Sequence, residues 1–88
     1  MEQEIQEFIK ALSEYIRTTM PIGEDADYCH DTVQIIDARN GLFRSAGIQS
    51  TDEQHNIYTL RSLCRLDEDT FEYIPDEGKL RSLARSFF

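Results

Sequence analysis

An apolar stripe near the N-terminus constrains the fold more than any other feature of this sequence. Between residues 2 and 19, large apolar side chains recur every three or four positions, which is the spacing of one face of an α-helix. The stripe consists of Ile5, Phe8, Ile9, Leu12 and Ile16. Pro21 disfavours helical angles at the residue before it, and Gly23 follows. The sequence therefore predicts a helix over residues 2–19.

A second apolar stripe lies between residues 25 and 45. It consists of Ala26, Cys29, Val33, Ile36 and Phe43. A further stripe beside it consists of Ile35, Leu42 and Ala46. Asn40-Gly41 interrupts this stripe with a turn signal, and glycine alone costs a helix interior about 1 kcal/mol relative to alanine. Because the helical register continues on both sides of the dipeptide, we predict a helix over residues 25–45. A break at Asn40-Gly41 is the alternative.

The last third of the chain contains a near-repeat. The hexapeptide LRSLCR at residues 60–65 returns as LRSLAR at residues 80–85. Each copy follows an acidic opening, spaces two leucines by three positions and ends in arginine, which is favoured at the C-terminal end of a helix. We interpret the copies as the ends of two amphipathic helices, with internal duplication as the alternative.

The starts of these two helices are also marked in the sequence. Ser50 and Glu53 have the spacing of a capping box, which predicts a helix over residues 51–64. Pro75 suits the first position of a helix over residues 75–87.

The segment between these helices, residues 66–74, differs in character. Asp67-Glu68-Asp69 resembles a solvated turn, and Thr70–Ile74 is rich in β-branched and aromatic residues. We therefore predict a single, mainly α domain over residues 1–88, a small irregular four-helix bundle with a short strand or β-hairpin at about residues 66–74.

Composition narrows the range of functions. The chain carries 17 acidic and 9 basic residues, a net charge of −8, and both halves are acidic. Such a surface repels phosphate backbones and favours a basic partner. The sequence has no stretch of 18 apolar residues and no apolar signal core, so we predict a cytoplasmic protein without a membrane span. Cys29 and Cys64 are then expected to be reduced, with a disulfide as the alternative.

No segment carries a specific catalytic or cofactor signature. Asp27 and His30, like Asp52 and His55, have the i, i+3 spacing of carboxylate–imidazole pairs in di-metal bundles, but the other helices offer no inward carboxylates. Cys29 beside His30 is a poor nucleophile pair, because adjacent helical residues point about 100° apart. We predict a protein that is not an enzyme and has no cofactor or metal.

The remaining signals favour protein association. Phe87 and Phe88 end the chain beside the predicted inward stripe, so we predict a self-associating or partner-docking face. Its residues are Tyr73, Leu83, Phe87 and Phe88. Closure of the core by both rings is the competing interpretation.

The alternative function is a nucleic-acid-binding regulator with a winged-helix-like layout. It would use a local basic patch made of Arg61, Arg65, Lys79, Arg81 and Arg85. Both elements that would contact DNA are acidic, which disfavours this alternative.

Overall fold

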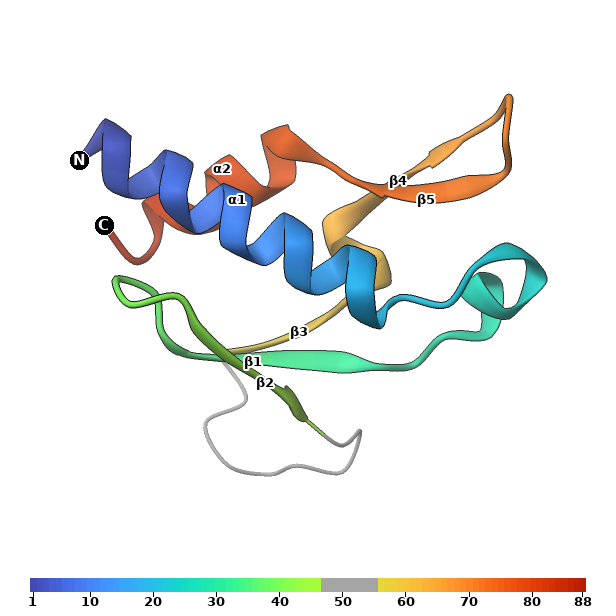
Figure 1. The fold of residues 1–88 in the computed structure, drawn as a ribbon, viewed down its shortest axis with the longest axis horizontal. Coiled ribbons are helices and arrows are strands. Elements are labelled where there is room, and N and C mark those ends of the chain that lie inside the picture. Colours follow the sequence, from blue (N-terminus) through green and yellow to red (C-terminus); the bar gives the residue numbers. More distant parts are fainter. Residues whose placement is uncertain (47–55) are drawn as a thin grey trace.

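The computed structural model describes residues 1–46 and 56–88, which form a mixed α/β domain (Figure 1). Two α-helices, α1 (Glu2–Thr19) and α2 (Glu77–Arg85), lie near the two ends of the chain. Strands β1 (Thr32–Asp37), β2 (Leu42–Ala46) and β3 (Ile57–Thr59) form one antiparallel sheet in the order β2-β1-β3. Strands β4 (Cys64–Asp67) and β5 (Glu72–Pro75) form a separate hairpin. The predicted all-α four-helix bundle is therefore wrong.

Helix α1 occupies the residues predicted for it, because its signal is local. The side chains of Ile5, Phe8, Leu12 and Ile16 are buried. Helix α1 contacts α2 and lies over the three-stranded sheet (Figure 1), and these side chains share one core with Val33 and Ile35 of β1. The prediction of a helix over residues 2–19 is confirmed.

The prediction of a helix over residues 25–45 is wrong. Residues Gly23–Tyr28 form a short 3-10 helix, η1, and β1 and β2 then pair as an antiparallel hairpin. Val33, Ile35 and Ile36 are β-branched, and such side chains fit a strand better than a helix. At helical spacing Val33 and Ile35 belong to two different stripes, whereas alternation places both on the buried face of β1.

The turn between β1 and β2 contains the dipeptide Asn40-Gly41, so the turn signal was real. The Asp37 carboxylate accepts hydrogen bonds from the backbone N–H groups of Arg39 and Asn40, at 3.1 and 3.4 Å. Gly41 has φ +65°, in the left-handed region that glycine adopts without strain. The break predicted as the alternative is a full reversal of the chain into a second strand.

The prediction of a helix over residues 51–64 is wrong for the part that the structure describes. Residues 51–55, and the capping pair Ser50 and Glu53, lie outside the described residues. Residues 57–59 are β3, and the first copy of the near-repeat forms only the 3-10 turn η3 (Arg61–Leu63) before entering β4. Leu60 and Leu63, the two leucines of this copy, are nonetheless buried.

The predicted hairpin and last helix are present with shifted bounds. β4 and β5 pair from Cys64 opposite Pro75 to Asp67 opposite Glu72, so the hairpin starts two residues earlier than predicted. Pro75 ends β5, and α2 begins only after Asp76. The Asp76 side chain accepts a hydrogen bond from the backbone N–H of Lys79 at 3.2 Å, which caps the helix.

Replacing Gly41 with alanine distinguishes the observed hairpin from the predicted helix, because the two structures predict opposite changes in the free energy of unfolding. In a helix, Gly41→Ala would raise the free energy of unfolding by about 1 kcal/mol. In the observed turn it should lower it by about 1–2 kcal/mol, because a Cβ atom disfavours the left-handed conformation. Urea unfolding followed by circular dichroism measures the difference. Gly41→Asn, a residue that tolerates this conformation, should cost less; a stabilising Gly41→Ala would contradict the hairpin.

Candidate functional site

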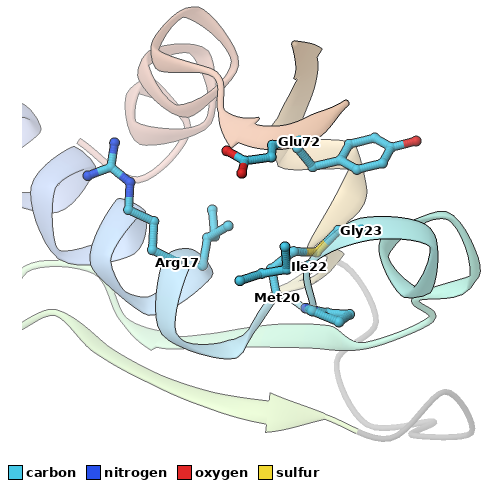
Figure 2. A pocket seen from close by; sticks show the side chains of 8 residues that line it. Arg17, Met20, Ile22, Gly23 and Glu72 are labelled. Atoms are coloured by element: carbon cyan, nitrogen blue, oxygen red, sulfur yellow. The ribbon is translucent and has the colours of Figure 1, made fainter. Parts of the chain in front are cut away.

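The main concave surface in the described part of the chain lies between the end of α1 with η1 and the β4–β5 hairpin. It consists of two adjoining cavities of about 150 and 460 Å³ that share Ile22, Gly23 and Glu72. We call this surface, between residues 16–27 and residues 70–73, the hairpin groove. Figure 2 shows Met20 and Ile22 on one wall and Glu72 on the other, with Arg17 reaching from α1.

The first wall of the hairpin groove arises from the way α1 ends. Pro21 stops the helix, and Gly23, at φ +76°, redirects the chain into η1. Between them Ile22 has an extended backbone, and its side chain is 81% exposed. A large aliphatic side chain is thereby displayed at the rim instead of joining the core.

The second wall carries an unusual residue at the tip of the β4–β5 hairpin. Phe71 has φ +58° and is the one residue other than glycine with a positive φ in the described parts of the chain. Its N–H donates to the carbonyl oxygen of Asp67 at 2.7 Å, which closes the four-residue loop. Its ring is 71% exposed beside the groove. The position suits glycine or asparagine, yet it holds a large aromatic ring.

A three-residue contact joins the two walls. The Tyr73 hydroxyl on β5 donates to the Asp27 carboxylate on η1 at 2.8 Å. The Arg61 guanidinium donates to the Asp27 backbone carbonyl and lies 5.5 Å from the centre of the Tyr73 ring. We call Asp27, Arg61 and Tyr73 the clamp. Because the clamp fixes η1 against β5, the groove is formed before anything binds.

The hydrogen bond to Asp27, followed by desolvation, raises the pKa of Tyr73 above its ordinary value. The neutral phenol is therefore favoured by folding. The hydrogen bond stabilises the folded protein fully below the ordinary tyrosine pKa of about 10. This contribution is lost as the pH rises through the higher pKa that Tyr73 has in the folded state.

The predicted interface residues do not form one surface. Tyr73 lines the hairpin groove, but Leu83 is buried in the core. The rings of Phe87 and Phe88 are half-buried, with centroids 6.1 and 6.0 Å from that of Phe8. These contacts are those of rings that close the core. They lie near the chain termini, away from the β4–β5 hairpin (Figure 1).

The predicted basic residues are spread over several elements, and three contact groups of their own chain. Arg61 belongs to the clamp, and Lys79 donates to the carbonyl oxygen of Cys64 at 2.9 Å. Arg81 pairs with Glu2 at 2.6 Å and with Glu77 at 3.7 Å. Arg65 lies on β4 opposite Ile74, and Arg85 ends α2. The helix order of a winged-helix layout is not found in the described residues, since strands replace its second helix.

The candidate nucleophile and metal residues are only partly placed. Cys29 and His30 line a hollow with Thr59, Arg61 and Ser62, whereas Asp52 and His55 lie outside the described residues. Cys29 and Cys64 are both free thiols. Burial raises the pKa of the Cys64 thiol to about 11, which keeps it protonated and unreactive at neutral pH.

Sequence reasoning missed Ile22, Glu24 and Phe71 as groove residues. Phe71 was assigned to a strand, where alternation says nothing of a positive φ. Ile22 and Phe71 each lie in a short acidic stretch of the sequence, and that pattern was the available signal for a binding surface.

Comparisons with protein-family models, curated proteins and solved structures found no match to this chain. Among the helices that the structure describes, none is both long and apolar enough to cross a membrane.

Removing the Tyr73 hydroxyl tests the clamp. Tyr73→Phe should lower the free energy of unfolding, and Asp27→Ala should remove most of that difference in a double-mutant cycle. Ultraviolet titration should also show the pKa values of both Tyr58, raised by burial, and Tyr73, raised by its hydrogen bond to Asp27, above the ordinary range, and Asp27→Ala should lower that of Tyr73 only. Tyr28→Phe is the matched control, since Tyr28 is 77% exposed. Equal losses from Tyr73→Phe and Tyr28→Phe would contradict the clamp.

Proposed function

We propose that this chain is a non-catalytic docking module that binds a protein partner in the hairpin groove. The observation that carries the proposal is Phe71, whose backbone is in the left-handed conformation and whose ring is 71% exposed. The backbone conformation costs about 1–2 kcal/mol for a residue with a Cβ atom. The exposed ring also forgoes roughly 1.5–3 kcal/mol of burial. Contact with a partner protein would bury this ring, which the fold itself leaves exposed.

The surroundings of Phe71 support docking. Ile22 stands on the opposite wall and is also exposed, so two large apolar side chains border one concave surface. Interfaces concentrate their binding energy in such apolar and aromatic anchors next to pockets. The clamp holds both walls in place, so binding need not order them, and that lowers the entropic cost of association.

The structure gives less support to nucleic acid as the partner. The groove contributes the carboxylates of Glu24, Asp27 and Glu72 against one lining cation, Arg17. Three of the five predicted basic residues already contact carboxylate or carbonyl oxygens of the chain. Phosphate binding would have to displace those contacts or overcome the carboxylates.

Substitutions at Phe71 should separate stability from binding. Phe71→Gly relieves the backbone strain and should raise the free energy of unfolding by about 1 kcal/mol, which corresponds to a rise in Tm of roughly 4–8 °C. Phe71→Ala removes the ring but keeps the Cβ atom, so it should give little or no gain. Thermal unfolding of both variants measures the difference. A Tm of Phe71→Gly at or below that of the parent would contradict strain at this position.

Photo-cross-linking tests the docking function itself. A benzophenone amino acid at position 71, expressed in the native host, should give a discrete adduct with a partner that mass spectrometry identifies. The same group at Leu42, which is 52% exposed on the three-stranded sheet, is the control. The purified partner should then bind the parent chain, and Phe71→Gly and Phe71→Ala should both weaken binding by roughly tenfold or more. Absence of an adduct at position 71, or the same adduct from both positions, would overturn the proposal.

A further inference from the structure

The negative charge of this protein is concentrated in two short segments. Residues 22–31 contain four acidic and no basic residues, and residues 66–72 again contain four acidic and no basic residues. The remaining 71 residues carry nine of each sign. The whole net charge of −8 therefore belongs to these two segments, which are 34 residues apart in the sequence.

The fold brings these two segments to the two sides of the hairpin groove. Residues 22–31 include η1, and residues 66–72 include the tip of the β4–β5 hairpin. Glu24, Asp27 and Glu72 line the groove together with Ile22 and Phe71. The apolar anchors are thus surrounded by carboxylates from both walls.

The local cations do not neutralise this surface. Arg61 is engaged by the Asp27 backbone carbonyl and the Tyr73 ring. Arg17 lines the smaller cavity but not the larger one, where Phe71, Glu24 and Asp27 lie. The groove therefore has an end that contains Arg17 and an opposite, acidic end between η1 and the hairpin tip.

We infer that the occupant of the groove is a cationic segment of the partner protein, in which Lys or Arg residues flank an apolar side chain. This inference rests on the proposed docking function and adds the chemistry of the partner. A neutral apolar segment would cover carboxylates without pairing them, which is costly. An acidic segment or a nucleic acid would meet like charge. A cationic segment seats its apolar residue against Ile22 and Phe71 and brings its cations to Glu24 and Glu72.

The test uses three synthetic eight-residue peptides with one apolar centre and different flanks. Acetyl-AKRLLKRA-amide, acetyl-AQQLLQQA-amide and acetyl-AEELLEEA-amide are titrated into the full ¹⁵N-labelled chain and followed by NMR. The cationic peptide should shift the amide resonances of Ile22, Glu24 and Phe71 and bind roughly tenfold more tightly than the glutamine peptide, while the glutamate peptide should not bind. Raising NaCl from 20 to 300 mM should weaken the cationic peptide severalfold, because salt screens exposed charges.

A matched pair of variants separates recognition in the groove from general attraction to an acidic protein. Glu24→Gln with Glu72→Gln should weaken the cationic peptide roughly tenfold. Glu4→Gln with Glu7→Gln makes the same change in net charge on the N-terminal half of α1 and should have little effect. Equal weakening by both pairs would overturn the inference.

The peptides also separate this inference from the docking function. Equal binding of the glutamine and cationic peptides at Phe71 would refute the selection of charge and leave docking intact. No binding of the cationic peptide at millimolar concentration would refute the inference, and the cross-link from position 71 would then decide the docking function independently.

Discussion

The fold depends on the burial of one aromatic ring, that of Phe8. Its side chain is 2% exposed, and three other rings from two parts of the chain lie beside it. Phe43 of β2 approaches at 5.8 Å between centroids, and Phe87 and Phe88 approach from the C-terminal end. Phe8 therefore joins α1, the three-stranded sheet and the end of the chain in one core. In a chain of 88 residues, which buries a smaller fraction of its surface than a larger domain does, such a shared contact stabilises several elements at once.

This arrangement places the aromatic cluster and the candidate site at opposite ends of the domain. The aromatic cluster lies near the two termini, and the hairpin groove lies beyond the C-terminal end of α1 (Figure 1). Strain at Phe71 and exposure of Ile22 both lie at the groove end of the domain and not in the aromatic cluster. The clamp of Asp27, Arg61 and Tyr73 compensates locally with directional contacts. A small domain can carry an unfavourable surface feature in this way without disturbing its core.

The parts of the fold that were predictable are those whose signal is local. α1 was found from its apolar stripe, and α2 and the β4–β5 hairpin were found with shifts of one or two residues, because helix periodicity and the composition of residues 66–74 are local properties of the sequence. The β1–β2–β3 sheet was missed. A short stretch such as Val33–Ile36 contains apolar residues at both spacings, and the choice between helix and strand depends on pairing with residues 42–46 and 57–59.

The amount of charge and the apolar stripe of α1 were determined by the sequence alone, since each is a property of residue identity and local spacing. Only the tertiary structure decided that Glu24 and Asp27 line one groove with Glu72. It also decided that Phe71 is exposed there, whereas Phe87 and Phe88 pack against the core. The physical reason is that solvent exposure and electrostatic potential depend on which distant segments the core brings together. Residues that are neighbours in the sequence do not determine which distant segments come together.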